Sequence, residues 1–306
     1  MSEVILATGG YDEKVVLWNP STEVATRVIP LKDVHVSALA VTPDRQYIAV
    51  AAYKSLKLFD LQSNSTIPVH NYDGHSGNIT AIGFPKRSNW LYTASEDGTI
   101  RIWDFNTNRS QRCYEGKTGV NTAVLHPNQS ELIAGYEDGL LAVWDIASSS
   151  YRIVVNPDEE AIRSTQIAGD ARFGVYGNNL GVITIWTLDG DQFRILGRIQ
   201  AHNNLITKCV LSMDSKLLAT CSADKTVKLW NVNLDSEELL GLDKALIGHK
   251  MWVWDANFTC DSAYIATAST DATAKLWEVS SGRIARNYIG VHSKGICSLV
   301  LNDLTI

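Results

Sequence analysis

Positive charge is scarce in this sequence. Its 27 Lys and Arg residues are outnumbered by 33 Asp and Glu residues, which gives a formal net charge of −6. A chain with this balance has no general positive field that would hold a phosphate backbone or an anionic lipid surface. We therefore expect neither nucleic acid nor a membrane as a partner.

Paired cysteines and long apolar runs are also missing. The five cysteines are far apart in sequence and form no C-x-x-C pair, which excludes a disulfide framework and a zinc site of the usual spacing. The apolar stretch at residues 4–7 is too short for a signal peptide, and no run approaches the roughly 18 residues of a membrane span. These absences predict a cytosolic or nuclear protein without an integral membrane segment.

A short segment that ends in an aromatic residue recurs along the chain, with 41 to 47 residues between successive aromatic positions. That spacing is typical of a four-stranded propeller blade and exceeds the roughly 33 residues of the common two-helix repeats. Within each copy the first and third residues are apolar, and this period of two predicts a β-strand. The seven copies are residues 15–18, 56–59, 100–103, 141–144, 183–186, 227–230 and 274–277.

A turn signal precedes most of these segments. Aspartate, often beside glycine, tolerates the backbone angles that reverse a chain between two strands. A β-rich segment lies before each turn, so every repeat reads as strand, turn, strand, turn, strand, and we predict an all-β protein. The turn aspartates are Asp12, Asp97, Asp138, Asp224 and Asp271.

A histidine stands 28 residues before Trp103, Trp230 and Trp277. Two of these histidines, His75 and His249, lie in Gly-His dipeptides, and two of the aromatic segments end in Trp-Asp. Together these dipeptides resemble the signature of the WD-repeat family. The resemblance implies a seven-bladed WD-repeat β-propeller that forms a single domain over residues 1–306.

The two ends of the chain are expected to complete one blade. The first repeat starts at Val4 with no room for an innermost strand, whereas a strand expected at residues 296–301 follows the seventh repeat. We predict that this C-terminal strand pairs with residues 4–8, because such closure removes exposed sheet edges.

The same trio of residue types recurs near three of the tryptophans and raises an enzymatic alternative. Ser, His and Asp are the components of a hydrolase triad, but an enzyme needs one triad with an oxyanion site rather than several copies. The repetition instead resembles the buried Asp–His–Ser–Trp hydrogen-bond tetrad of the WD-repeat family. The predicted tetrads are His75, Ser95, Asp97 and Trp103; His202, Ser222, Asp224 and Trp230; His249, Ser269, Asp271 and Trp277; and, in the closing blade, His292 with Asp12 and Trp18.

The repeats that contain Phe59, Trp144 and Trp186 lack the trio, so we expect the second, fourth and fifth blades to be held less strongly from within. The sequence also contains no phosphate-binding loop, dinucleotide-binding glycine pattern or His-Glu-x-x-His helix. We therefore expect a protein that is not an enzyme and has no cofactor, no metal and no small-molecule substrate.

Two tryptophans lie outside the predicted tetrads. Residues 251–255 align with residues 77–81, which puts Val253 in a buried position and turns Trp252 and Trp254 to the rim and channel side of one end of the ring. Two interpretations stay open. The indoles fill the neighbouring blade, or they anchor a partner, because exposed tryptophan is enriched at binding hot spots.

Several further stretches carry a more specific resemblance: residues 41–45, 125–129, 131–133, 218–228, 252–255 and 301–303. They are similar to the small G-beta-like WD-repeat subunit of TOR kinase complexes. That family implies a non-catalytic subunit of TOR complexes one and two. Such a subunit docks on and stabilises the kinase catalytic domain, meets the other subunits through it, and supports nutrient and growth signalling. It is cytoplasmic, and peripheral at endomembranes through the complex.

We predict the kinase-docking site on the end of the ring where the turn aspartates and the starts of the innermost strands lie. The second and seventh blades flank the closing blade, so residues far apart in sequence share one patch. The residues expected to bind the partner are His35, Asn78, Leu205, Trp252 and Trp254, with Tyr11, Glu96 and Glu137 nearby.

Two other functions remain as alternatives. One is a scaffold in another complex, either a ubiquitin-ligase substrate receptor or a G-protein β-type subunit, and the other is a hydrolase on a propeller. Ligase receptors normally carry an adaptor-binding domain and G-protein β subunits an N-terminal coiled-coil helix, and we expect neither in these 306 residues. A hydrolase would show an unrepeated acidic or histidine cluster, which the sequence lacks.

Overall fold

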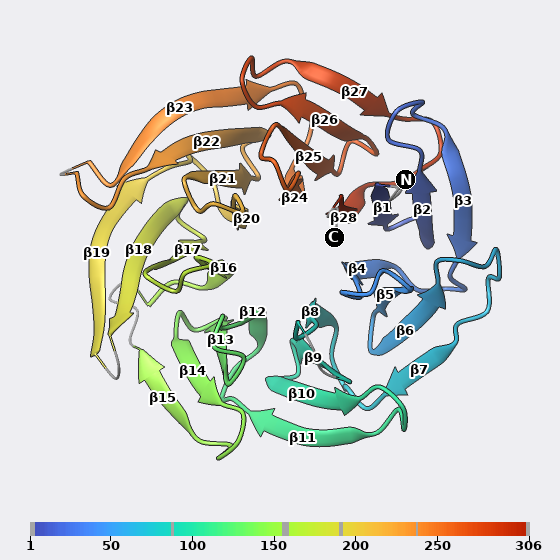
Figure 1. Cartoon of the computed structure of the whole chain (residues 1–306), viewed down its shortest axis with the longest axis horizontal. Coiled ribbons are helices and arrows are strands. Elements are labelled where there is room, and N and C mark those ends of the chain that lie inside the picture. The colour runs from blue at the N-terminus through green and yellow to red at the C-terminus, as the bar shows by residue number, and fades with distance from the viewer. Residues whose placement is uncertain (1–3, 87–88, 155–158, 190–191, 237, 304–306) are drawn as a thin grey trace.

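The computed structural model describes residues 4–86, 89–154, 159–189, 192–236 and 238–303. Within these ranges the chain forms 28 strands in seven four-stranded sheets. The sheets stand as blades around a central channel, and both ends of the chain lie in the same blade (Figure 1). The prediction of an all-β, seven-bladed propeller is therefore confirmed.

The blades are numbered from the one that holds both ends of the chain, and their strands are given from the channel outward. Blade one contains β28 (Ile296–Asn302), β1 (Ile5–Gly10), β2 (Lys14–Trp18) and β3 (Ala25–Pro30); blade two β4 (Val36–Val41), β5 (Tyr47–Ala52), β6 (Ser55–Asp60) and β7 (His70–Asp73); blade three β8 (Ile79–Gly83), β9 (Trp90–Ser95), β10 (Thr99–Asp104) and β11 (Ser110–Glu115). Blade four contains β12 (Val120–Leu125), β13 (Glu131–Tyr136), β14 (Leu141–Asp145) and β15 (Tyr151–Val154); blade five β16 (Ile162–Ile167), β17 (Gly174–Asn178), β18 (Val182–Asp189) and β19 (Gln192–Gln200). Blade six contains β20 (Ile206–Leu211), β21 (Leu217–Ser222), β22 (Thr226–Val232) and β23 (Leu240–Ile247); blade seven β24 (Val253–Phe258), β25 (Tyr264–Ser269), β26 (Ala274–Glu278) and β27 (Ile284–Tyr288).

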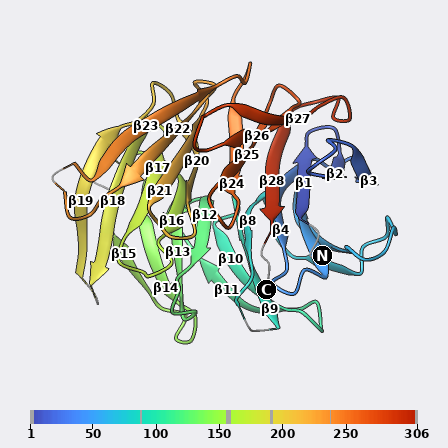
Figure 2. The same ribbon diagram turned by 45° about the horizontal axis from the view of Figure 1, so that its top comes forward.

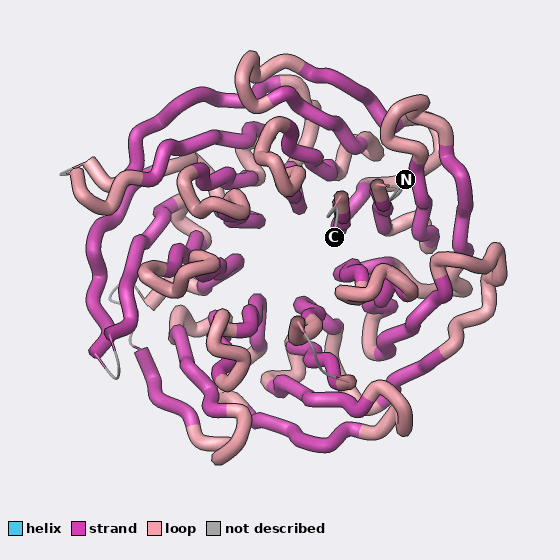
Figure 3. Tube along the Cα trace, in the orientation of Figure 1, coloured by secondary structure: helices cyan, strands magenta, loops and turns pink. Residues whose placement is uncertain are grey.

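The hydrophobic core lies between the blades. In β9 every residue from Leu91 to the end of the strand is buried, because both faces of the blade pack against neighbours. Leu58 of blade two, for example, shares a cluster with Leu91 and Trp103 of blade three. Figure 3 shows that strands and loops alone build the described part of the chain. Each blade therefore depends on both neighbours for its buried surface.

The close approach of neighbouring blades requires small residues on the second strands. A Cβ atom added at Gly9 in β1 would stand 2.4 Å from Cγ1 of Val36 in blade two, which is too close for any side chain. Glycine at this position lets β1 and β4 pack directly together.

The last strand closes the ring. β28 pairs with β1 in antiparallel register, with Leu301 opposite Leu6 and Ser298 opposite Gly9, so the predicted closure is confirmed. Figure 2 shows β28 beside β1 although the two strands stand at opposite ends of the sequence. Blade seven also holds β28, because Oδ2 of Asp255 accepts a hydrogen bond from the backbone N–H of Leu299 at 2.9 Å.

Each innermost strand carries a β-bulge directly after its first residue. In β24, Val253 pairs with Ser269 and Asp255 with Ala268, so Trp254 is the extra residue. A bulge turns its extra side chain away from the regular ladder. The corresponding residues in blades one to seven are Cys297, Ser37, Thr80, Asn121, Arg163, Thr207 and Trp254.

We predict that β28 is required for folding. Deletion of residues 294–306 removes the strand that pairs with β1 and leaves Asp12 without His292. The truncated protein should be insoluble or should lose its cooperative thermal unfolding, followed by circular dichroism. Deletion of residues 304–306 alone keeps β28 and serves as the control. An unchanged melting temperature after the longer deletion would contradict the closure.

Candidate functional site

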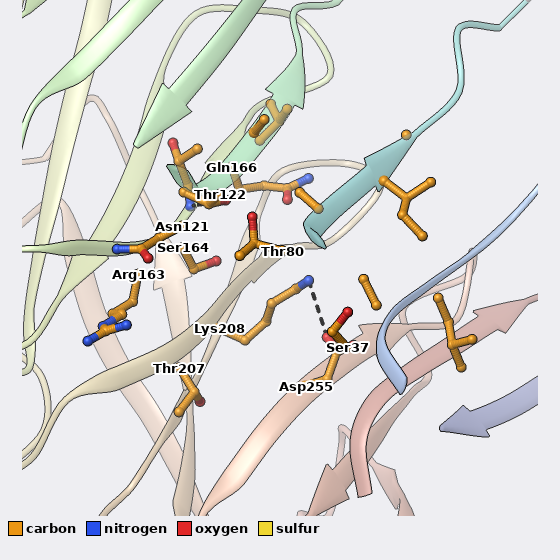
Figure 4. A pocket seen from close by; sticks show the side chains of 18 of the residues that line it. Ser37, Thr80, Asn121, Thr122, Arg163, Ser164, Gln166, Thr207, Lys208 and Asp255 are labelled. Atoms are coloured by element: carbon orange, nitrogen blue, oxygen red, sulfur yellow. Dashed lines mark hydrogen bonds and ion pairs between the residues drawn. The ribbon is translucent and has the colours of Figure 1, made fainter. Parts of the chain in front are cut away.

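The innermost strands enclose a channel of about 870 Å³. Figure 4 shows polar side chains that project into it from several blades, among them Ser37, Thr80, Asn121 and Thr207. The bulges place these side chains on the channel wall. The channel lining therefore includes all seven bulge residues together with other residues of the innermost strands.

Four bulge residues tie their blade to the next one. Each donates a hydrogen bond from its side chain to the backbone carbonyl of the first residue of the following innermost strand. The bonds are Ser37 Oγ to Ile79 at 2.6 Å, Thr80 Oγ1 to Val120 at 2.7 Å, Asn121 Nδ2 to Ile162 at 3.1 Å, and Thr207 Oγ1 to Val253.

The other three bulge positions hold residues of a different kind, namely Arg163, Trp254 and Cys297. The Arg163 Nε donates to Oδ1 of Asn179 at 2.7 Å, and the Trp254 Nε1 donates to Oγ1 of Thr270 at 2.8 Å, each within its own blade. Residues that break a repeated structural pattern are candidates for function. At Trp254 the fold has a large aromatic ring where four other blades have a serine, threonine or asparagine that links them to the next blade.

Trp252 and Trp254 form an aromatic pair at one end of the ring. Their ring centroids are 5.6 Å apart, and Val253 between them is fully buried at the position that Ile79 takes in blade three. Trp252 is 40% exposed to solvent. This exposure favours the interpretation of the pair as a partner anchor over that of filling between two blades.

The surface continues from the tryptophans across the closing blade. The backbone N–H of Thr270 donates to the carbonyl of Trp252 at 2.9 Å. Thr270 also packs against Gly295, where an added Cβ would stand 2.9 Å from the Thr270 Cα. The carbonyl of Gly295 accepts a hydrogen bond from the backbone N–H of Tyr11 at 2.9 Å. Blade seven and blade one thus present one continuous edge.

Aromatic rings carry this edge on into blade two. The Tyr11 ring lies 5.6 Å from the His35 ring, which lies 6.0 Å from the ring of Tyr53. Burial raises the pKa of the Tyr11 phenol, and burial raises the pKa of the neighbouring Cys297 thiol to about 12, so both groups remain protonated. We call the side chains of Trp252, Trp254, Tyr11, His35 and Tyr53 the aromatic patch.

The other predicted partner residues lie farther round the same end of the ring. Asn78 donates from Nδ2 to Oε1 of Glu96 at 3.4 Å in blade three. Leu205 of blade six lines the channel together with Asn78 and Glu96, whereas Glu137 of blade four lies on the rim outside the channel lining. Asn78 adjoins the aromatic patch, because the backbone N–H of Ile79 beside it donates to the carbonyl of Tyr53 at 2.8 Å.

An ion pair that the sequence analysis missed supports the tryptophans from inside the channel. The Lys208 Nζ of β20 lies 3.2 Å from Oδ1 of Asp255, which follows Trp254 in β24 (Figure 4). The carboxylate of Asp255 raises the pKa of Lys208, which therefore stays charged. Sequence offered no signal for the pair, since its partners are 47 positions apart in different repeats.

Away from this surface, buried tetrads hold four blades together. In blade three, Trp103 Nε1 donates to Oγ1 of Thr93 at 2.8 Å, Thr93 donates to Nε2 of His75 at 2.7 Å, and His75 Nδ1 donates to Asp97 at 2.9 Å. Burial lowers the pKa of His75, so the ring is neutral and the tautomer follows from its partners. Each tetrad thus links its buried side chains in one continuous series of hydrogen bonds.

The sequence prediction of a serine in these tetrads is wrong. The hydroxyl between histidine and tryptophan belongs to a threonine two residues earlier, and Ser95 instead accepts a hydrogen bond from the backbone N–H of Asp97 at 3.1 Å. Trp103 pairs with Leu91, and Ser95 lies about 13 Å farther along that strand, beyond the reach of the indole. Thr220 replaces Ser222, Thr267 replaces Ser269, and Thr8 completes the tetrad of His292, Asp12 and Trp18.

Two of the three blades without the trio use other side chains in its place. In blade four the phenol of Tyr136 accepts the Nε1–H of Trp144 at 2.9 Å and occupies the space beside Gly116. In blade five Asn178 caps its turn by accepting the backbone N–H groups of Leu180 and Val182, each at 3.0 Å. The weaker cohesion expected for these blades stays a prediction.

Two further kinds of feature are absent from the described residues. No group of three or more His, Cys, Asp or Glu residues among them is placed to hold a metal ion. The described part of the chain also contains no helix long and apolar enough to cross a membrane. The serines of the suggested triads are fully buried, and Ser222 donates to the carbonyl of Leu205 at 2.9 Å rather than to histidine.

Comparison with known proteins gives consistent matches. The family described as "WD domain, G-beta repeat" matches residues 66–104, 108–145, 193–231 and 242–278. The chain is 40% identical to the target of rapamycin complex subunit LST8 of Mus musculus, over 98% of this chain and 95% of that protein. It is 43% identical to subunit LST8-1 of Arabidopsis thaliana, over 81% of this chain and 82% of that protein. It is 37% identical to subunit wat1 of Schizosaccharomyces pombe, over 99% and 97%. The solved β-propeller domain of Cps50 (Swd1) from Myceliophteria thermophila is similar in fold, with a TM-score of 0.74 at 18% identity over 85% of this chain and 88% of that one.

The tetrads predict how a single hydroxyl contributes to stability. Thr220→Val keeps the shape of the side chain but leaves both His202 and Trp230 without their shared partner. We expect a loss of about 2 to 4 kcal/mol in the free energy of unfolding, because two buried polar groups become unsatisfied. Thr220→Ser keeps the hydroxyl and should cost about 1 kcal/mol for the lost methyl. Equal losses for the two variants, measured by urea denaturation, would contradict the tetrad.

The same network predicts a dependence of stability on pH. Burial lowers the pKa of His75, His202 and His292, so in mildly acidic solution the unfolded chain binds protons that the folded chain does not. The free energy of unfolding should therefore fall as the pH drops below about 6.5, by up to about 1.4 kcal/mol per pH unit for each histidine. His202→Gln should reduce this slope. Urea denaturation between pH 7.5 and 5.5 checks both statements, and stability that rises on acidification would refute them.

Proposed function

Because the chain belongs to the WD-repeat family of LST8 target of rapamycin complex subunits, we propose that it is a non-catalytic subunit that docks on the TOR kinase domain. It supports the catalytic conformation of the kinase in TOR complexes one and two and thereby nutrient and growth signalling. It meets the other subunits through the kinase, in the cytoplasm and at the periphery of endomembranes where the complex carries it.

The observation that carries this proposal is the aromatic patch. Trp252 is 40% exposed, and Trp254 stands at a bulge where four other blades place a side chain that caps a neighbouring carbonyl. A protein that exposes paired indoles at the end of a rigid ring has a ready anchor for a partner, since tryptophan carries much of the energy at protein interfaces.

Neighbouring residues hold Trp254 of the patch in place before a partner binds. The Asp255 carboxylate joins β24 to β20 through Lys208 and to β28 through the backbone N–H of Leu299. The Trp254 indole is fixed by its hydrogen bond to Thr270. A docking surface that is already ordered loses little conformational entropy when the partner binds. Such a surface can stabilise a kinase domain without changing its own shape.

The alternatives receive less support. A hydrolase would require a reactive serine beside a histidine, whereas Ser95, Ser222 and Ser269 are fully buried. A scaffold of another complex is disfavoured by relatives in animals, a plant and a fungus that are all named as target of rapamycin complex subunits.

The docking site predicts a clear effect of removing both indoles. The double variant Trp252→Ala, Trp254→Ala should no longer co-purify with the TOR kinase, because each side chain contributes about 2 kcal/mol or more if it is a hot spot. Its melting temperature should fall much less than that of Trp277→Ala, because Trp252 is exposed and both indoles lie outside the tetrads, so that only the hydrogen bond of Trp254 to Thr270 is lost.

Trp277→Ala is the matched control, since this buried tryptophan of blade seven donates to Thr267 in a tetrad. It should lose the kinase through unfolding, with a cost of about 3 to 5 kcal/mol. A folded double variant that still retains the kinase would refute the docking site, and so would a double variant that loses the kinase only because it has unfolded.

A further inference from the structure

The end of the ring that carries the aromatic patch is divided by charge. Four consecutive blades, from six through seven and one to two, each place an exposed lysine there. We call these residues the lysine arc; they are Lys225, Lys250, Lys294 and Lys54.

Each member of the lysine arc is fixed to this end by its neighbours in the chain. Lys225 follows Asp224 in a hairpin turn, and the backbone N–H of Lys250 donates to Oδ2 of Asp271 at 2.8 Å. Lys294 precedes the Gly295 that joins blade seven to Tyr11, and the Lys54 Nζ lies 5.2 Å from the Tyr53 ring centroid. Three members of the lysine arc, Lys250, Lys294 and Lys54, therefore border the aromatic patch.

The remaining blades carry the opposite charge at the same end. Exposed glutamates precede the turn aspartates of blades three and four, and another lies in the loop before β16 of blade five. The Glu159 backbone lies against the turn of blade four. A Cβ atom added at Gly139 in that turn would stand 2.8 Å from the carbonyl carbon of Glu159. We call these residues the glutamate arc; they are Glu96, Glu137 and Glu159.

Charges of the other sign occur in both arcs but do not cancel them. Glu13 and the exposed Asp33 stand near the lysine arc, and the exposed Asp73 pairs with Ser55 next to Lys54. The exposed Lys117 and Arg163 lie beside the glutamate arc. The turn aspartates Asp12 and Asp271 are paired with histidines in the tetrads and face inward. At this end of blades six, seven, one and two, exposed lysines thus outnumber exposed carboxylates, on a chain whose net charge is −6.

From this arrangement we propose that the segment of the partner that covers the aromatic patch is acidic at its margins and apolar at its centre. The proposal rests on the docking function above and adds the chemistry and orientation of the bound surface. Apolar side chains of the segment pack on the indoles of Trp252 and Trp254, and flanking carboxylates approach the lysine arc. The glutamate arc repels the same segment, so the segment binds in a single orientation about the axis of the ring.

The lysine arc and the indoles of the aromatic patch have different roles in binding. The lysines are exposed, so each ion pair adds little to the affinity. Their summed field acts over a Debye length of about 10 Å at 0.1 M salt and raises the rate of association. The indoles supply the affinity and the charges select the orientation, which is the division of labour found at many protein interfaces.

The first test maps which charges meet. A water-soluble carbodiimide joins a lysine amine to a carboxylate that touches it, with loss of water, and the products are identified by mass spectrometry of the full-length protein bound to the TOR kinase. We expect cross-links from the lysine arc to Asp or Glu of the kinase. Cross-links from the glutamate arc to kinase lysines, with none from the lysine arc, would overturn the proposal.

The second test reverses the charge. In the double variant Lys250→Glu, Lys294→Glu the rate of association with the immobilised TOR kinase should fall roughly tenfold at low salt, and the difference should shrink in high salt. Lys86→Glu, Lys216→Glu changes the same number of exposed charges in loops at the opposite end of the ring and should bind like the unchanged protein. Equal rates for the two double variants at low salt would refute the role of the lysine arc.

Failure of this inference and failure of the docking site give different results. If Trp252→Ala, Trp254→Ala abolishes binding while the lysine variant associates at the normal rate, the docking site stands and the acidic nature of the partner segment is wrong. If the folded tryptophan variant binds normally, the docking site is wrong and this inference falls with it.

Discussion

The antiparallel pairing of β28 with β1 is the constraint on which the rest of the molecule depends. The hydrophobic clusters lie between blades, so a blade whose neighbour is missing exposes one of its faces. Without the pairing, the ring would end in two such blades and in open strand edges. Asp255 reinforces the joint from blade seven, because its carboxylate binds the backbone of Leu299 and the hydroxyl of Ser298.

The bulge positions along the channel serve either to join neighbouring blades or to bind a partner. The bulge of each innermost strand places one residue outside the regular strand pairing. Where that residue is Ser37, Thr80, Asn121 or Thr207, it binds a carbonyl of the next blade and strengthens the ring. At Trp254 the inter-blade bond is replaced by an aromatic surface beside the closing blade. The stability of the joint there is supplied by Asp255 instead, which frees the position for binding.

The tetrads show where reasoning from the sequence was partly right. The constant spacing of His75 and Trp103 identified two members of a buried network, and the turn residue Asp97 was the third. The hydroxyl was assigned to Ser95 because Ser recurs at that place, but Thr recurs two residues earlier with the same regularity. Sequence periodicity cannot separate the two, since both side chains are small, buried and on the same face of one strand. The strand register separates them, because it sets Thr93 within reach of the indole.

The sequence by itself determined the number of blades, the four-stranded repeat, the closing strand and the alignment that exposes Trp252. These features follow from local periodicity, which repeats along the chain and is visible in one dimension. Only the tertiary structure decided the continuity of the aromatic patch through Gly295, the ion pair of Lys208 with Asp255, and the separation of the lysine and glutamate arcs. These features join residues of different repeats across the ring, and their distances are set by how the blades pack rather than by any spacing in the sequence.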